Sequence, residues 1–216
     1  MEQVNEAPSL LLLAAGSGTR MGGPKALLRY VDGTALLTAQ VERRLTAAVM
    51  RGLDSDVIVV LGPALAQTSR LMPRSARVVE NPDYRQGLST SLHAGLSAVP
   101  NTAAGVVISL LDLLDVPAEA HGRLLDATAP ENLARAHWNS VPGHPVALGR
   151  EHIAEALASA AGDEGLQAML KRHSGSGGVN GVECADLLPP GSDGLVDVDT
   201  PEAAAQFGLH LEGAHS

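Results

Sequence analysis

The sequence predicts a three-layer α/β/α fold built around a mainly parallel mixed sheet. Short apolar runs, typical of buried strands, alternate with segments of helical periodicity, as in parallel sheets that helices cover on both faces. The first apolar run, 9–14, ends in a glycine-rich loop, and the run 105–111 ends at Asp112. Ligands bind at the carboxyl ends of strands in such sheets, so these polar segments are expected to converge.

The composition indicates a globular protein, predicted to be a single domain over residues 1–216 with disordered ends at about 1–7 and 208–216. Hydrophobic residues make up 45% and aromatic residues 2%, so the core must consist of Leu, Val and Ala. The net charge of −9 disfavours nonspecific binding to nucleic acid or anionic membrane. A single cysteine excludes an intrachain disulfide. With no signal peptide and no apolar run of transmembrane length, a cytoplasmic location is expected.

The expected elements follow from apolar runs, turn residues and helical spacing. Strands are expected at 9–14, 56–61, 76–80, 105–111, 133–138, 144–148, 179–183 and 194–198. Helices are expected at 34–50 (with Thr34 as N-cap), 64–71, 89–99, 117–127, 151–160, 164–173 and from 201 onward. Residues 174–178 are expected to form a flexible Gly/Ser loop, and residues after Phe207 a frayed tail. No internal repeat or long linker divides the chain.

The glycine-rich loop that ends at Lys25 has the composition of a phosphate cradle. Glycines leave backbone amides open to a ligand, and two cations, Arg20 and Lys25, accompany them. The dinucleotide fingerprint fails at Met21, where Gly or Ala is required. The P-loop pattern fails because Pro24 displaces the lysine by one position and Ala26 replaces the magnesium-binding hydroxyl.

The complete pattern LAAGxGxRMGxPK, at residues 13–25, resembles the signature of the molybdopterin nucleotidyltransferases, and most closely that of the molybdenum cofactor cytidylyltransferases. Three further segments, 81–96, 143–146 and 197–202, are similar to later motifs of that family, in the same order. The resemblance implies a Rossmann-like nucleotidyltransferase fold. It also implies an enzyme in which a phosphate of the acceptor attacks the α-phosphorus of a nucleoside triphosphate and expels pyrophosphate.

The resemblance also implies roles for individual residues. Arg20, Lys25 and Asp112 would be catalytic, the two cations by neutralising charge on the leaving pyrophosphate. The implied nucleotide-binding residues are Leu13, Ala14, Ala15, Gly16, Ser17, Gly18, Thr19, Arg20 and Lys25. The turn Ala14-Ala15-Gly16 resembles the cytidylyltransferase version, whereas the guanylyltransferase version has an extra glycine. CTP is therefore favoured over GTP, although one methyl group discriminates modestly.

A lone carboxylate after an apolar strand, such as Asp112, is costly unless it is exposed, paired or metal-bound. The resemblance implies a Mg²⁺ site there, because Asp112 matches the family's metal-binding aspartate. Asp199 is the expected second ligand, with helix N-capping as its alternative, and Asp197 is expected to face the other side. The family usually has a small residue before this aspartate and Met-Pro or Gln-Pro after it. Here Leu111 precedes it and Leu113-Leu114 follow, which is expected to loosen the loop and to let Asp115 compete as the ligand.

Acceptor binding is assigned to Ser89 and Ser91 at a helix start, with capping as the alternative, and to His144, with a structural role as the alternative. Trp138 and Cys184 are expected to be core residues. The expected substrates are CTP and a molybdopterin-type acceptor, with a molybdenum hydroxylase as recipient of the product. Two other functions stay open: a nucleotidyltransferase of the same fold acting on a sugar phosphate or phospholactate, and a noncatalytic protein that delivers the molybdenum cofactor.

Overall fold

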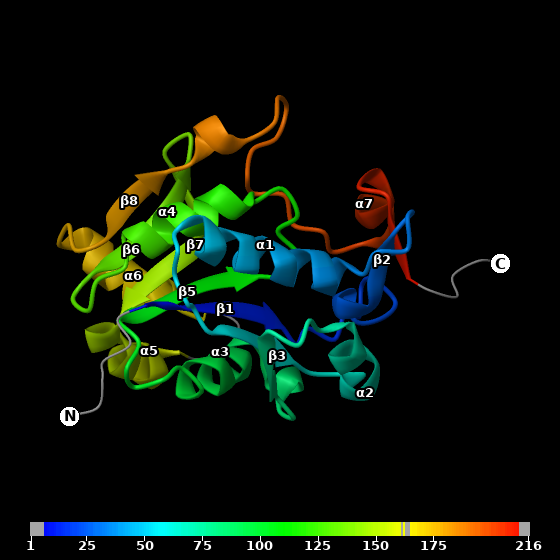
Figure 1. Cartoon of the computed structure of the whole chain (residues 1–216), viewed down its shortest axis with the longest axis horizontal. Helices are drawn as coiled ribbons and strands as arrows, with labels where there is room; N and C mark the ends of the chain where they lie inside the picture. Colours follow the sequence, from blue (N-terminus) through cyan, green and yellow to red (C-terminus); the bar gives the residue numbers. More distant parts are fainter. Residues whose placement is uncertain (1–6, 161, 163–164, 212–216) are drawn as a thin grey trace.

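A computed structural model describes residues 7–160, 162 and 165–211. Its centre is a seven-stranded sheet in the order β4-β3-β1-β5-β7-β6-β8 (Figure 1). Strand β7 pairs antiparallel with both β5 and β6, whereas the other pairings in this sheet are parallel. The predicted mixed, mainly parallel sheet is therefore confirmed.

The elements lie close to their predicted positions. The strands are β1 (Ser9–Ala14), β2 (Leu28–Tyr30), β3 (Val57–Leu61), β4 (Ala76–Glu80), β5 (Gly105–Leu110), β6 (Leu133–Trp138), β7 (Val141–Gly149), β8 (Asn180–Glu183) and β9 (Leu209–Leu211). The α-helices are α1 (Leu36–Met50), α2 (Leu65–Thr68), α3 (Leu88–Ser97), α4 (Ala118–Asp126), α5 (Ile153–Ser159), α6 (Gln167–Gly175) and α7 (Pro201–Gln206). Five short 3-10 helices lie at Lys25–Leu27, Ser69–Leu71, Tyr84–Gln86, Arg150–His152 and Ala185–Leu187.

Strand β1 separates two hydrophobic cores, because successive side chains of a strand point to opposite faces. Leu10 and Leu12 belong to the core that α1 and α4 cover, whereas Leu11 and Leu13 belong to the core that α3, α5 and α6 cover. Figure 1 shows α1 and α4 on one face of the sheet and α3 and α5 on the other. The three-layer prediction is thus confirmed, and β1 places the loop after it at the carboxyl edge of the sheet.

Several local predictions were wrong. The N-cap of α1 is Ala35, and Thr34 instead closes a turn in which its amide donates to Asp32 Oδ1 at 2.9 Å. Residues 194–198 form no strand; Asp197 makes only an isolated bridge with Leu113. Residues 174 and 175 belong to α6 rather than to a loop.

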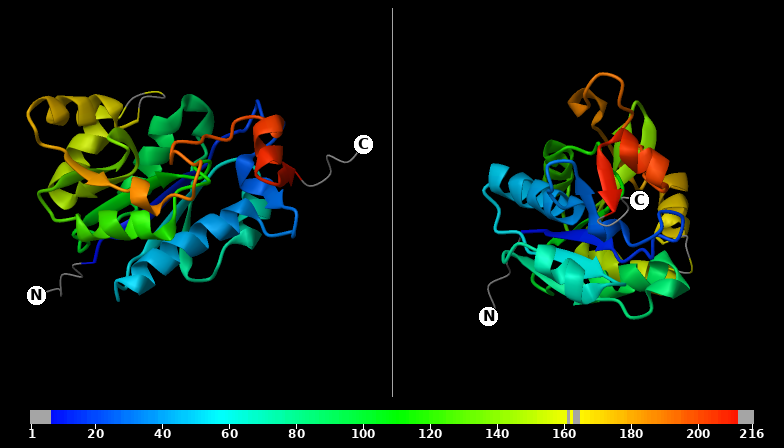
Figure 2. Two further views of the ribbon diagram at one scale, coloured as in Figure 1. Left: turned by 90° about the horizontal axis from the view of Figure 1, so that it is seen from above. Right: turned by 90° about the vertical axis from the view of Figure 1, so that its right-hand side faces the viewer.

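The expected frayed tail also needs correction where the structure describes it. Strand β9 pairs antiparallel with β2, which the sequence did not predict. In the views of Figure 2, the red C-terminal segment accordingly lies beside the blue segment that contains β2. The remaining predicted disordered ends, 1–6 and 212–216, lie outside the described residues.

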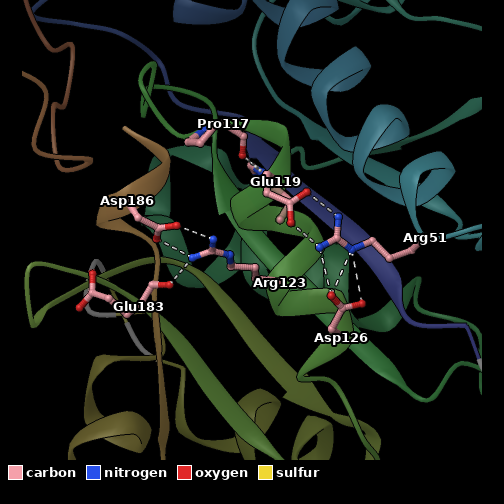
Figure 3. Close-up of polar contacts among 8 residues, drawn as sticks. Arg51, Pro117, Glu119, Arg123, Asp126, Glu183 and Asp186 are labelled. Carbon is pink, nitrogen blue, oxygen red and sulfur yellow. Dashed lines mark hydrogen bonds and ion pairs between the residues drawn. The ribbon is translucent and has the colours of Figure 1, made fainter. Parts of the chain in front are cut away.

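Two arginines fasten helix α4 to its neighbours (Figure 3). At the end of α1, Arg51 pairs with Glu119 at 2.7 Å and with Asp126 at 3.0 Å, so one guanidinium contacts both ends of α4. Arg123 of α4 pairs with Asp186 at 2.6 Å and donates to the carbonyl of Glu183 at 2.7 Å. The second contact fixes the start of the long segment 184–199 that returns across the sheet edge.

Candidate active site

The loop after β1 folds into a closed turn. The amides of Met21 and Gly23 both donate to the carbonyl of Gly18, at 3.0 and 3.1 Å, and the Met21 side chain is buried in the core. Gly18 has φ +62° and a Cβ there would lie 1.8 Å from the Gly23 carbonyl oxygen, so only glycine fits. Among the described residues, the amides of 16–20 make no hydrogen bond. The first half of the loop therefore contains five successive open donors.

Lys25 lies at the centre of an ionic cluster that joins the loop to two distant segments. Its Nζ is 2.7 Å from Asp112 Oδ2 and 3.4 Å from Asp197 Oδ1, and it makes a still shorter contact with Asp199 Oδ1. Arg20 Nη1 lies 2.7 Å from the other oxygen of Asp199, with the arginine side chain 76% exposed. The predicted convergence of the loop, Asp112 and Asp199 is confirmed as geometry.

The charges in this cluster shift one another's pKa values. Burial opposes the charge on Lys25, but Asp112, Asp199 and Asp197 outweigh it and raise the pKa of the ammonium above its ordinary value. The hydrogen bond from Lys25 lowers the pKa of Asp199. Burial, followed by repulsion from Asp112, raises the pKa of Asp197. Lys25 is thus firmly charged at neutral pH, while three carboxylates compete for it.

The same carboxylates fit a divalent cation. Asp112, Asp197 and Asp199 each offer an oxygen, and these oxygens lie within 4.8 Å of one another. Oδ1 of Asp112 is buried and has no hydrogen-bond partner among the described residues. Hard carboxylate oxygens in excess of the available cations suit Mg²⁺ or a similar ion. The cluster therefore differs from the predicted pair of ligands by one member, Asp197.

The expectation that Asp197 faces away from Asp199 was wrong, because both carboxylates contact Lys25. The bridge of Asp197 to Leu113 turns its carboxylate toward Lys25, on the side that Asp199 also faces. Asp199 is not the N-cap of α7 either; that position belongs to Thr200, whose Oγ1 accepts from the amide of Ala203 at 3.2 Å. The sequence did carry the signal, because residues two apart on a strand share a face, so alternation itself places Asp197 and Asp199 on one side.

Asp115 does not compete for the cluster. Its Oδ2 accepts a short hydrogen bond from Ser192 Oγ and another from the amide of Gly194 at 2.9 Å. Asp115 therefore fastens the middle of the segment 184–199, whose start is held by Arg123 (Figure 3). Asp115 also lies outside the group formed by Asp112, Asp197 and Asp199, so the geometry does not support the expectation that it competes as the ligand.

The loop after β5 is anchored without the family's proline. Leu111 and Leu114 are buried in the core. Arg43 of α1 donates a short hydrogen bond to the carbonyl of Leu114 and a longer one, 3.4 Å, to that of Val116. The expected loosening of this loop is therefore offset by apolar packing and by an arginine on the neighbouring helix.

Most predicted nucleotide-binding residues line one cleft of about 1110 Å³. The lining includes Leu13, Ala15, Gly16, Ser17, Gly18, Thr19, Arg20, Lys25, Asp112, Asp197 and Asp199. Ala14 does not line it, because its side chain is buried in the core of α1 and α4. The cleft is thus bounded by the glycine-rich loop on one side and by the acidic cluster on the other.

The three predicted acceptor residues lie in different surroundings. Ser91 lines the cleft, and its Oγ accepts from Asn81 Nδ2 at 2.9 Å. Ser89 is buried and does not line it; its amide donates to the carbonyl of Gly162. His144 lines a smaller recess beside the cleft. Trp138 and Cys184 are buried, as predicted.

Arginine 135 is a site candidate that sequence reasoning missed. It lines the same recess as His144 and is half-buried on β6. Strand alternation placed it at a partly exposed position between buried alanines, which in sequence resembles an ordinary surface arginine.

Among the helices that the structure describes, none is long and apolar enough to cross a membrane.

Comparison with known proteins gives the family. Residues 10–176 match the model of the MobA-like NTP transferase domain. Nicotine blue oxidoreductase of Paenarthrobacter nicotinovorans is 31% identical over 89% of this chain and 92% of its own length. Molybdenum cofactor cytidylyltransferase of Escherichia coli is 25% identical over 89% and 91%.

Among solved structures, Rv0371c of Mycobacterium tuberculosis superposes with a TM-score of 0.74 at 27% identity, covering 94% of this chain and 98% of that one. The manganese complex of the same protein superposes with a TM-score of 0.65 over 83% of this chain and 88% of that one. The loop, the sheet and the match over residues 10–176 agree, and the chain belongs to the MobA-like NTP transferase family.

Proposed function

We propose that this protein is a Mg²⁺-dependent nucleotidyltransferase that transfers CMP from CTP to the terminal phosphate of a molybdopterin-type acceptor. The observation that carries the proposal is the meeting of Lys25, Arg20 and three carboxylates in one large cleft. Nucleotidyl transfer needs positioned phosphates and charge neutralisation rather than a covalent intermediate with the protein. This cleft contains a glycine-rich loop that can position phosphates, and cations that can neutralise their charge.

The triphosphate is assigned to the first half of the glycine-rich loop. The amides of residues 16–20 are free of internal hydrogen bonds, whereas those of Met21 and Gly23 close the turn. Successive backbone amides at a strand end form an anion-binding concavity. The base and sugar are assigned to Leu13, Ala15 and Gly16, which line the cleft beside the loop.

Arg20 and Lys25 are assigned to the leaving pyrophosphate. Without a substrate, Lys25 neutralises Asp112 and Asp199, and Arg20 contacts Asp199. Phosphate oxygens offer both cations an alternative partner, to which the flexible lysine stem can turn. Fixed cations at developing negative charge are a strong source of catalysis.

The metal is assigned to Asp112, Asp197 and Asp199. A bound Mg²⁺ would supply positive charge to the phosphate oxygens. The unpartnered, buried Oδ1 of Asp112 and the excess of carboxylates over cations support this assignment. The solved manganese complex of Rv0371c, a structural neighbour, is consistent with a divalent ion in this fold.

The identity of the base is proposed from the turn Ala14-Ala15-Gly16 and from the cytidylyltransferase of E. coli, which is 25% identical. Acceptor contacts are assigned to Ser91 and His144, which line the cleft and its recess, whereas Ser89 is buried and lines neither. Delivery of the product to a molybdenum hydroxylase stays a prediction.

A second candidate function is oxidation–reduction of an aromatic compound. It is favoured by the relative that is 31% identical and is named nicotine blue oxidoreductase. The glycine-rich loop lacks the dinucleotide fingerprint at Met21. The acidic cluster around Lys25 suits phosphate chemistry more directly, so nucleotidyl transfer remains the first proposal.

The test is pyrophosphate release from CTP and from GTP, each with molybdopterin and Mg²⁺, by the wild type and by Asp112→Ala. We expect CTP to be preferred and Asp112→Ala to lose at least about 10³-fold in rate, as for removal of a principal charge-stabilising group. Asp126→Ala, an exposed aspartate of α4, is the control and should keep the wild-type rate.

The results separate the candidates. Equal rates for wild type and Asp112→Ala would refute the assignment of Asp112 as a metal ligand. Oxidation of a nicotinamide cofactor in the presence of an aromatic acceptor, without pyrophosphate release, would favour the second candidate. Binding of molybdopterin without turnover of any nucleotide would favour a delivery protein.

A further inference from the structure

A small recess adjoins the large cleft. It has a volume of about 120 Å³ and shares Leu13, Leu88 and Leu110 with the cleft, so a molecule can occupy both at once. Its walls come from β1, β5, β6, β7, α3 and α6. Because three of its residues also line the cleft, the recess is a side chamber of the candidate active site.

The size and lining of the recess suit one ring. An engineered cavity of about 150 Å³ lined by Leu, Ile and Phe binds benzene, and 120 Å³ is close to that value. Its deep wall is aliphatic, formed by Leu92, Ile108, Val146 and Leu170. A single planar six-membered ring therefore fits, whereas a fused ring system can insert only its terminal ring.

One arginine, Arg135, forms part of the wall of the recess. Arg135 is half-buried, and its Nε donates to the carbonyl of Gly143 at 2.8 Å. No carboxylate pairs with its guanidinium among the described residues. Burial alone accounts for the lowering of its pKa. The other guanidinium nitrogens of Arg135 are not among the buried polar atoms without a partner, so they keep contact with the open part of the recess and can donate to a ligand there.

His144 connects this arginine to the cleft. Its Nδ1 is buried and has no hydrogen-bond partner among the described residues. Burial lowers the pKa of His144 to about 4, with repulsion from Arg135 adding to the effect and attraction to Asp112 opposing it. The imidazole thus lies within electrostatic reach of both Arg135 and Asp112, and it presents a second unsatisfied polar atom.

We infer that this recess binds one planar six-membered ring of the acceptor substrate, whose carbonyl or carboxylate oxygen accepts hydrogen bonds from Arg135. The inference rests on the proposed function in taking the ring to be part of the acceptor. The apolar wall selects the shape of the ring, and Arg135 selects its oxygen substituent. Arg135 is therefore a specificity-determining residue.

The test uses three fragments of similar size: benzoate, benzamide and benzylamine, with binding followed by ligand-observed NMR. Benzoate and benzamide should bind, and benzylamine should bind at least about 10-fold more weakly, because its ammonium meets an unpaired cation. Arg135→Met should weaken benzoate at least about 10-fold. Arg74→Met, which removes an exposed arginine, is the matched control and should bind benzoate as the wild type does.

A second variant guards against a folding defect. Leu110 is half-buried and lines both the recess and the cleft, so Leu110→Phe should fill the entrance and weaken benzoate and benzamide alike. Circular dichroism should match the wild type in both variants. CTP affinity in Arg135→Met should stay within twofold of the wild type, since Arg135 does not line the large cleft.

Failure of this inference is distinguishable from failure of the proposed function. Equal binding of benzylamine and benzoate, or full benzoate affinity in both variants, would overturn the ring site even if pyrophosphate release is observed. If the wild type releases no pyrophosphate but benzoate binding still depends on Arg135, the ring site stands and the acceptor chemistry has to be reassigned.

Discussion

The large cleft and the recess beside it use arginine and lysine in opposite ways. In the cleft, Lys25 is surrounded by three carboxylates, and Arg20 shares one of them. In the recess, Arg135 has no carboxylate partner among the described residues, and most of the other lining side chains are aliphatic. In our proposals, the cleft exchanges charged partners during transfer, whereas the recess supplies one hydrogen-bonding cation to a ring.

The strongest test of the charged cleft is Lys25→Met. Removing the ammonium should reduce pyrophosphate release by about 10²–10³-fold, because a positioned charge at the leaving group is lost. It also leaves Asp112 and Asp199 without their principal cation. Pre-steady-state measurement of pyrophosphate release would give the rate.

The chain offers a matched control for this variant. Its sequence contains one other lysine, Lys171, which is exposed on α6. Lys171→Met should keep the wild-type rate. A Lys25→Met protein that retains more than half of the rate would remove Lys25 from the catalytic group and make its ion pairs purely structural.

A smaller effect is expected when the acidic side of the cleft is loosened. Asp115→Ala removes two hydrogen bonds that hold the segment carrying Asp197 and Asp199. These two hydrogen bonds contribute about 1–1.5 kcal/mol to holding the segment in place, so the rate of transfer should fall roughly 10-fold without them. A higher Mg²⁺ concentration should then be needed for the half-maximal rate. The measurement is a Mg²⁺ titration of pyrophosphate release.

Asp115→Asn is the conservative variant, because its amide oxygen can still accept from Ser192 or Gly194, and it should recover most of the lost rate. Arg123→Met loosens only the far end of the same segment (Figure 3) and should change the rate less than Asp115→Ala. Loss of transfer in both Asp115 variants that no Mg²⁺ concentration restores would show that Asp115 takes part in the site directly.

The two regions also differ in how far the sequence could predict them. The glycine-rich loop is local, because its glycines, Arg20 and Lys25 all stand in one short stretch after β1. Composition and spacing indicated a phosphate cradle, and the resemblance of the complete pattern to a known signature gave the nucleotidyltransferase assignment. Asp112 was predictable because a carboxylate directly after a buried strand is unusual. The parallel sheet then required these strand ends to meet.

Other features depend on contacts between distant segments. The pairing of β9 with β2 joins residues from opposite ends of the chain. Arg135 became a candidate only when the structure showed that, within the described part of the chain, no carboxylate pairs with it. In each case the decisive fact is a missing or non-local partner, which leaves no local pattern.

The smallest effect on transfer at neutral pH is expected from His144, on the recess side. Its pKa of about 4 keeps the imidazole neutral between pH 6 and 8, so the KM for the acceptor should not vary with pH there on its account. Its effect appears in stability instead. Between the ordinary value of 6.5 and about 4, the unfolded chain binds a proton at His144 that the folded chain excludes, so the free energy of unfolding falls as pH decreases.

Urea unfolding at pH 7.5 and pH 4.5 would measure this loss. His144→Asn should make the loss of unfolding free energy smaller by about 1–3 kcal/mol. The rest of the loss should persist, because burial also lowers the pKa of His121. His93→Asn, which alters an exposed histidine, should leave the loss unchanged. If His144→Asn and wild type lose equal stability between the two pH values, the imidazole is already solvated in the folded protein. The recess would then be wetter than its aliphatic wall implies, and the contrast with the charged cleft would weaken.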